Sequence, residues 1–420
     1  MKDQSREVSE VVAMQKRTTL EMIDAMDSQI DELVTPELVE GISKIYMVGC
    51  GDSYLAARGA RLFYDLHVGL PVEPIESMEF SRYAIDAMPK GSLVIGISYG
   101  GKVSRTIEAI IRARKRGAYT IVTTGYGQRG AALQSDAAIV GSLPGIRQVV
   151  DSLDAAVNAK KISMDEVMKE LVNAGGVERV AEKLGIHGAM HLALVGMGPI
   201  ISSILPLYLI GLRVGLLRNR LDPETAARLK RDMLHAIDVQ CESVERDLEP
   251  ARRLAEAFKG HTQFLFLGSG PSYASAYFCA TKLFEQVHLN GVAQYIEEWA
   301  HLQLFYTRPS GPPIFVLVPP GRSRDRAIEQ MQGMRKLGAT VVAICDSEDQ
   351  EILGIADYSI PIYGRVPEEL SPLVYVVPGE LFAFGLLGIR GQPPIPAPHS
   401  FQEMLEVNYG LIYASAIREE

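Results

Sequence analysis

The sequence has 420 residues, of which 47% are hydrophobic and 22% are charged, and its formal net charge is −9. This length and apolar content suffice for two domains with buried cores, and 38 glycines favour α/β architecture with tight turns over disorder. The acidic balance argues against nucleic-acid binding, because the basic runs, such as RARKR at 112–116, are short.

The N-terminal segment is predicted to be helical over residues 1–40. Residues 1–17 are charged throughout and contain no apolar core of a signal peptide, so we expect a cytoplasmic protein. The cysteines agree with this expectation, because none forms a CxxC pair and all lie in apolar or helical surroundings. We expect buried, reduced thiols and no metal site. The four cysteines are Cys50, Cys241, Cys279 and Cys345.

The first glycine turn follows a predicted strand and reads VGCGDSYLAA at 48–57. A strand that ends in Gly-x-Gly and continues into a small-residue helix typically binds phosphate at the helix N-terminus. A dinucleotide site would need a third glycine where Tyr54 stands, and the G-x-x-x-x-G-K-[ST] motif of nucleoside triphosphate sites does not occur. We therefore expect a phosphate monoester near Gly51 and Ser53. Asp52 is unfavourable beside an anion unless it points away or binds a sugar hydroxyl.

A second loop rich in hydroxyls, ISYGGKVSRT at 97–106, follows the next predicted strand and precedes a helix predicted to end at Gly117. Two helix N-termini lined by hydroxyls and small residues can hold one phosphate monoester. The alternative is that the serines only cap the helices. The candidate phosphosugar-binding residues of the two loops are Gly51, Ser53, Ser98, Tyr99, Gly100, Ser104 and Thr106.

The middle of the chain, residues 146–258, is predicted as a helical insertion and linker, because its second half carries apolar positions at helical spacing and no strand pattern. The stretch 199–217 is as long as a membrane span, but it contains Pro206 and Arg213, so we expect a buried helix and no membrane. A strand and a glycine turn are predicted within 190–203 and are not counted as a further domain.

An internal repeat relates the two halves of the chain. Residues 46–65 resemble 265–284, and residues 107–124 resemble 328–345, at a nearly constant offset. We interpret the repeat as an internal duplication. The duplication predicts a first domain at 41–145 and a second domain at 259–375, and a C-terminal helix and tail are predicted at 376–420.

The expected fold class is α/β, with two doubly wound parallel sheets in flavodoxin-like αβα sandwiches, because short apolar strands alternate with helices in both copies. Ligands of such sheets bind beyond the carboxyl ends of the strands, where both glycine turns fall. The loop of the second copy, VPPGRSRDR at 318–326, has fewer hydroxyls, but Arg322 and Arg324 are candidates to meet an anion. The predicted strands lie near 44–49, 93–97 and 119–124, and near 263–267, 314–318 and 340–345.

These motifs together resemble the SIS (sugar isomerase) family in its tandem two-domain form, and in particular the isomerase half of glucosamine-6-phosphate synthase. The turn GCGDSY is similar to that enzyme's C-G-T-S-Y turn, and ISYGGKVSRT is similar to its phosphate loop. Residues 280–305 resemble its catalytic stretch, in which a Glu precedes a His by sixteen residues, as Glu285 precedes His301. The resemblance implies that Glu285 moves a proton between C1 and C2 of the sugar and that His301 protonates the ring oxygen.

The same resemblance implies further site residues and a partner. Lys282 matches a polar position that implies phosphosugar binding, and Glu298 matches one that implies catalysis. Glu298 also corresponds to Glu79 of the first copy, so bracing of the turn is the alternative for both. The His of such enzymes commonly reaches in from a partner subunit, which implies a homodimer.

Several departures from the synthase limit the resemblance. Its glutaminase domain and N-terminal cysteine have no counterpart here, so we do not expect this chain alone to release ammonia from glutamine. Tyr99, Gly100 and Val103 replace three hydrogen-bonding residues of the phosphate loop. After Lys336 the sequence contains no lysine, so we do not expect Schiff-base catalysis from the tail. Residues 145–190 resemble an insertion relative to the family.

The expected function is therefore that of an enzyme acting on a hexose 6-phosphate or an amino-sugar phosphate, by aldose–ketose isomerisation, deamination or deglycation. It would need no metal or organic cofactor. The alternative is a non-catalytic sugar-phosphate-binding regulatory protein, which the missing tail lysine favours. A nucleotide-dependent oxidoreductase ranks low because both copies lack the third glycine.

Overall fold

The computed structural model describes residues 2–127, 129–141, 197–390 and 401–420. The chain divides into two compact units, each built around one sheet. The first-sheet unit comprises Arg17–Ala227 and Pro394–Glu420, and the second-sheet unit comprises Met1–Lys16 and Arg228–Pro393. The whole of the predicted insertion at 145–190 lies outside the described residues, and the domain boundaries stay predictions.

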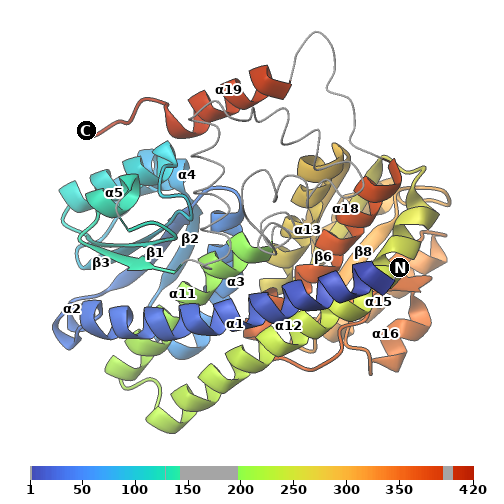
Figure 1. Ribbon diagram of the computed structural model, residues 1–420, viewed down its shortest axis with the longest axis horizontal. Coiled ribbons are helices and arrows are strands. Elements are labelled where there is room, and N and C mark those ends of the chain that lie inside the picture. Colours follow the sequence, from blue (N-terminus) through green and yellow to red (C-terminus); the bar gives the residue numbers. More distant parts are fainter. Residues whose placement is uncertain (1, 128, 142–196, 391–400) are drawn as a thin grey trace. The chain divides into compact units, whose positions relative to one another are not determined.

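The first sheet is parallel throughout and has the strand order β2-β1-β3-β4-β5 (Figure 1). The three central strands are almost completely buried, which explains why they read as continuous apolar runs. The order places the topological switch point between β1 and β3, as in flavodoxin-like sheets. The strands are β1 (Lys44–Gly49), β2 (Val72–Glu76), β3 (Ser92–Ile97), β4 (Tyr119–Thr124) and β5 (Ala137–Val140).

Helices cover both faces of this sheet. On one face, α5 packs on a core cluster that includes Tyr46, Val48, Val94 and Ile110, and it ends before Gly117, as predicted. On the other face, α3 packs against α11. The helices of this unit are α1 (Lys2–Leu33), α2 (Pro36–Glu40), α3 (Asp52–His67), α4 (Ser77–Arg82), η1 (Ala84–Ala87), α5 (Ser104–Lys115), α6 (Gly130–Gln134), α11 (Met197–Leu217) and α19 (Phe401–Tyr413); α1 contains a unit boundary.

The second sheet repeats this arrangement, with the order β10-β9-β8-β6-β7 and parallel pairing throughout. Counted within each unit, the two strand orders are the same, as expected of an internal duplication. Trp299 is buried in the core between this sheet and its helices. The strands are β6 (Gln263–Gly268), β7 (Asn290–Tyr295), β8 (Ile314–Val318), β9 (Val341–Cys345) and β10 (Tyr358–Ser359).

Helices also flank the second sheet (Figure 1). The long segment predicted to be helical up to residue 258 is α12, which begins in the first-sheet unit. The helices are α12 (Pro223–Phe258), α13 (Pro271–Val287), α14 (Ile296–His301), η2 (Gln303–Tyr306), α15 (Arg324–Lys336), α16 (Gln350–Ile355), η3 (Glu368–Leu370), α17 (Pro372–Tyr375) and α18 (Val377–Arg390).

Two helical stretches, Ile200–Leu217 and Glu368–Arg390, are long and apolar enough to cross a membrane by length and composition. They are 83% and 72% buried, respectively, which is the property of core helices in a soluble fold. The prediction of a buried helix at 199–217 is thus confirmed. The prediction of a strand and a glycine turn within 190–203 is wrong from Met197 onward, where α11 begins, and its earlier part lies outside the described residues.

Candidate functional site

The first glycine turn lies at the carboxyl end of β1. The backbone of Gly51 has φ 56° and ψ −132°, a conformation that residues with a side chain rarely adopt. A Cβ on Gly49 would lie 2.9 Å from the backbone of Ser53, so the turn is closely packed on that side. Gly51 caps α3 without a side chain, so no side-chain oxygen occupies the positive end of this helix. The Ser53 N–H donates to Cys50 O at 3.2 Å, and contact of Ser53 with phosphate stays a prediction.

The loop after β3 is held by backbone hydrogen bonds. Ser98 N–H donates to Thr123 O at 3.0 Å, and Gly101 N–H donates to Ser98 O at 3.0 Å. The Tyr99 carbonyl accepts from Gly125 N–H at 2.9 Å. Gly101 has a φ of 70°, which closes the turn. A loop fixed in this way presents a defined surface to a ligand.

Ser98 and Gly100 lie on this loop with different surroundings. The Ser98 residue is 1% exposed, and its Oγ is buried without a hydrogen-bond partner among the described residues. Such a hydroxyl is costly unless a ligand completes its hydrogen bonds. A Cβ on Gly100 would meet nothing within 4 Å, so the loop is open at that point.

The N-terminus of α5 follows the loop. Val103 precedes the helix and gives no side-chain cap, and Ser104 is buried in the first turn. Because β1 and β3 are neighbours and parallel, the N-termini of α3 and α5 lie at the same edge of the sheet, at its switch point. Two positive helix ends at one edge favour a phosphate dianion.

Thr106 has another partner. Its Oγ1 lies 3.1 Å from Ser77 Oγ, and both side chains are buried. The contact joins α5 to the start of α4. A structural role is therefore favoured for Thr106, whereas contact with phosphate stays a prediction.

The thiol of Cys50 is half-buried, so the prediction of burial is wrong for this cysteine, while Cys241, Cys279 and Cys345 are buried; all four are free thiols. Cys50 Sγ lies 3.1 Å from Glu76 Oε1. Burial, reinforced by this hydrogen bond, raises the pKa of the Cys50 thiol to about 11. The thiol therefore keeps its proton at neutral pH.

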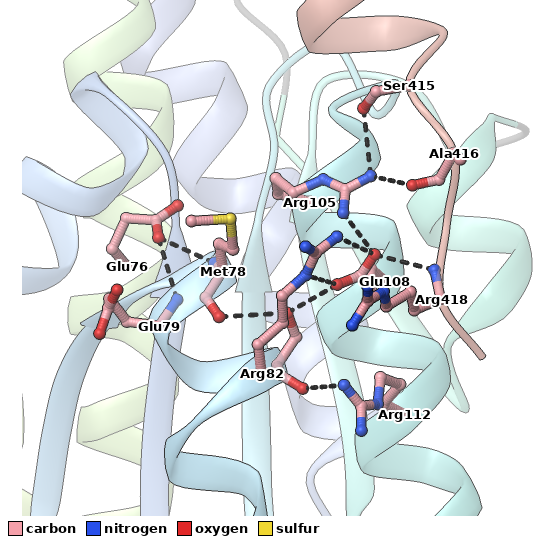
Figure 2. Close-up of polar contacts among 11 residues, drawn as sticks. Glu76, Met78, Glu79, Arg82, Arg105, Glu108, Arg112, Ser415, Ala416 and Arg418 are labelled. Atoms are coloured by element: carbon pink, nitrogen blue, oxygen red, sulfur yellow. Dashed lines mark hydrogen bonds and ion pairs between the residues drawn. The ribbon is translucent and has the colours of Figure 1, made fainter. Parts of the chain in front are cut away.

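Sequence reasoning missed a buried carboxylate on α5, that of Glu108. It joins this helix to α4 and to the segment after α19 (Figure 2). The side chain of Glu108 has no exposed surface, and it accepts from Arg82 Nε at 2.9 Å and Ser81 Oγ at 3.1 Å. Arg105 and the backbone N–H of Arg418 complete the set. Burial raises the pKa of Glu108, but the hydrogen bonds, led by that from Arg82, outweigh it and lower the pKa to about 2.

The candidate catalytic residues lie in the second-sheet unit. Lys282 is 3% exposed, and its Nζ lies 2.6 Å from Glu285 Oε2 and 4.4 Å from the centre of the Phe278 ring. The Glu285 side chain is 56% exposed. The spacing of three residues on α13 brings these two groups onto one face of the helix.

His301 and Glu298 lie on α14 and are both exposed. His301 Nε2 is 3.9 Å from Glu297 Oε1, and Glu297 in turn accepts from Arg326 Nε at 2.7 Å. The histidine therefore contacts a carboxylate one helical turn away, while Glu285 contacts Lys282. The catalytic roles of Glu285, Glu298 and His301 stay predictions.

The matching loop of the second copy has a different charge balance. Arg324 Nε and NH2 lie 2.6 and 2.7 Å from the two oxygens of Asp349, and NH2 lies 2.9 Å from Glu351. Glu368 accepts the backbone N–H of Arg322. These carboxylates argue against an anion at Arg322 and Arg324, so the two copies differ at this edge.

Comparisons with known proteins agree with this arrangement. Residues 40–140 match the SIS domain family model. The chain is 23% identical over 371 residues to a glutamine–fructose-6-phosphate aminotransferase (isomerizing) from Methanothermobacter thermautotrophicus, covering 88% of this chain and 53% of the relative. The chain spans about half the length of the curated relatives it matches.

Two solved structures are similar to this chain over most of its length. The C-terminal domain of glucosamine-fructose-6-phosphate aminotransferase from Francisella tularensis has a TM-score of 0.69 and 18% identity, covering 92% of this chain and 98% of its own. Tagatose-6-phosphate ketose/aldose isomerase from Escherichia coli has a TM-score of 0.64 and 15% identity, covering 94% and 96%. At these identities the likeness shows the fold, which is that of two SIS-type α/β sheets.

Proposed function

We propose that this chain, whose residues 40–140 are a SIS domain, binds a phosphorylated sugar at the carboxyl edge of its first sheet. The observation that carries the proposal is the meeting of two helix N-termini without side-chain caps, α3 and α5, at the switch point. The buried Ser98 hydroxyl supports it, because a phosphate or sugar oxygen would supply the missing hydrogen-bond partner.

The proposed ligand is a hexose 6-phosphate or an amino-sugar phosphate. Two similar proteins support this ligand class: one is a glutamine–fructose-6-phosphate aminotransferase, and the other is a tagatose-6-phosphate ketose/aldose isomerase. A monoester fits the site better than a dinucleotide, because Tyr54 stands where a dinucleotide turn would have its third glycine.

The proposed activity is aldose–ketose isomerisation, or deamination or deglycation of the same class of substrate. Isomerisation needs a base that carries a proton between C1 and C2 and an acid that opens the ring. Glu285 is proposed as that base and His301 as the acid, because carboxylate and imidazole side chains are common general bases and acids in enzymes. Lys282 holds the Glu285 carboxylate at 2.6 Å and would orient it.

The alternative proposal is a regulatory protein that binds sugar phosphate without turnover. The exposure of Glu285 favours it, because a side chain that is 56% exposed and ion-paired lacks the apolar enclosure that strengthens a carboxylate base. A homodimer in the cytoplasm is proposed under both alternatives. Sedimentation analysis would measure the oligomeric state directly.

The test begins with a thermal-shift screen using fructose 6-phosphate, glucosamine 6-phosphate and fructosamine 6-phosphate. A ligand present at 100 times its Kd stabilises the fold by about 2.7 kcal/mol, which is readily measured. Absence of a shift with every compound would contradict sugar-phosphate binding.

Turnover of each binding compound then separates the two alternatives. An enzyme should lose turnover in Glu285→Gln while it retains binding. The matched control is Glu256→Gln, because Glu256, near the end of α12, forms an exposed pair of the same spacing with Lys259, which follows the helix. Binding without turnover by the wild-type protein would favour the regulatory alternative.

A further inference from the structure

The residues after α19 form an extended segment that lies along α5 in the first-sheet unit (Figure 2). We call residues 415–419 the C-terminal strap. Ser415 Oγ accepts from Arg105 NH2 at 3.1 Å, and the Ala416 carbonyl accepts from the same nitrogen. The Arg418 N–H donates to Glu108 Oε2 at 2.9 Å, and Glu419 pairs with Lys115 at 2.9 Å.

The strap is bonded to the interior of the unit and not only to its surface. Glu108 has no exposed side-chain surface, and Arg105 has 16%. A hydrogen bond to a buried charged group is stronger than one between exposed groups, because water competes less for either partner. The Arg418 N–H and the Arg105 guanidinium are therefore the contacts that hold the strap.

The strap meets α5 at the end that the proposed function assigns to phosphate. Arg105 is the second residue of α5, and Glu108 lies one turn further along. The first turn of this helix supplies the N–H groups for the anion. A cation in the first turn opposes the helix dipole, and Glu108 offsets that charge by pairing with Arg105.

We propose that the C-terminal strap stabilises the phosphate-binding end of α5, with Arg105 and Glu108 as positioning residues between the strap and the loop. A docked strap keeps the first turn of α5 formed, which raises the affinity for the sugar phosphate. Coupling of two binding equilibria is reciprocal, so bound sugar phosphate in turn keeps the strap docked. This inference rests on the proposed function and concerns the regulation of the same site.

The strap can be released in the intact chain by a single backbone change. Arg418→Pro removes the N–H that Glu108 accepts, because proline has no backbone N–H. Arg418→Ala keeps that N–H and serves as the matched control. Hydrogen exchange of the C-terminal peptide measures docking of the strap, and calorimetric titration with fructose 6-phosphate and with inorganic phosphate measures affinity.

We expect faster exchange of the strap in Arg418→Pro and a Kd for fructose 6-phosphate at least about fivefold higher than in Arg418→Ala. In the wild-type chain, saturating fructose 6-phosphate should slow exchange of the strap. A released strap with an unchanged Kd would overturn the inference and leave the proposed function intact. Unchanged exchange in Arg418→Pro would also overturn it. If the wild-type chain binds neither probe, the proposed function itself fails.

Discussion

Arg82 donates two hydrogen bonds to Glu108, from Nε at 2.9 Å and from NH2 at 3.3 Å, across 26 residues of sequence. The pair joins α4 to α5 (Figure 2). Arg82 corresponds by the internal repeat to His301 of the second copy. The first copy thus uses this position to bind a buried carboxylate.

Replacing Glu108 should destabilise the first-sheet unit. We expect Glu108→Gln to lower the free energy of unfolding by about 2–3 kcal/mol, because it leaves the Arg82 and Arg105 guanidinium groups without their charged acceptor. Urea denaturation at neutral pH measures the loss. Glu73→Gln removes a partly exposed pair with Lys44 and should cost less than about 1 kcal/mol. Equal losses in the two variants would contradict the role given to burial.

Removal of the Ser98 hydroxyl should separate binding from stability. We expect Ser98→Ala to unfold at the same or a slightly higher denaturant concentration, because it removes a buried oxygen that lacks a partner. Binding of fructose 6-phosphate should weaken by about tenfold, the value of one hydrogen bond to a charged group. Ser243→Ala removes a similar buried hydroxyl from α12 and should leave binding unchanged. Unchanged binding in Ser98→Ala would remove Ser98 from the site.

The glycine turn provides a test of backbone geometry. A Cβ on Gly51 would meet nothing within 4 Å, so any loss in Gly51→Ala comes from its positive φ and not from a clash. We expect that loss to be about 1–3 kcal/mol in the free energy of unfolding. Gly354→Ala adds a methyl group at an equally open position without a positive φ, and it should change stability by less than about 1 kcal/mol. An unchanged free energy of unfolding in Gly51→Ala would show that the turn can change its backbone conformation without cost.

Asp247 on α12 should make stability depend on pH. Both of its carboxylate oxygens are buried without a hydrogen-bond partner among the described residues, and burial raises its pKa to about 8. The folded chain therefore keeps a proton that the unfolded chain releases near pH 4. The contribution of Asp247 is complete below about pH 4 and falls by about 1.4 kcal/mol per pH unit until about pH 8.

Asp247→Asn should remove this slope, because an amide does not titrate in that range. Urea denaturation of both proteins at pH 5, 6, 7 and 8 checks the prediction. The variant should gain stability relative to the wild-type chain as the pH rises. Parallel pH profiles for the two proteins would mean that the carboxyl group is solvated.

The central strands could be predicted from the sequence, because a strand buried on both faces is a continuous apolar run. The edge strands could not. The strand β2 reads VEPIE and contains a proline, β7 is half-buried with a polar pattern, and β10 has two residues. Only their pairing with β1, β6 and β9 identifies them as strands.

The candidate site also has features that the sequence predicts and features that it does not. The glycine turns depend on neighbours within a few residues, so the local sequence predicts them. Glu108 has partners 26 and 310 residues away, and nothing in the local pattern of α5 distinguishes it from a solvated glutamate. A charged residue on the apolar side of an amphipathic helix is the signal that sequence reasoning could have followed.

The C-terminal strap is held partly through peptide groups, the Ala416 carbonyl and the Arg418 N–H. Side chains at these two positions do not define those contacts, so substitutions there can accumulate without moving the segment. Chains with unrelated C-terminal sequences could share the same attachment. In relatives from other species, a strap of this kind would then be recognised by a buried glutamate at the position of Glu108 and not by similarity of the C-terminal sequence.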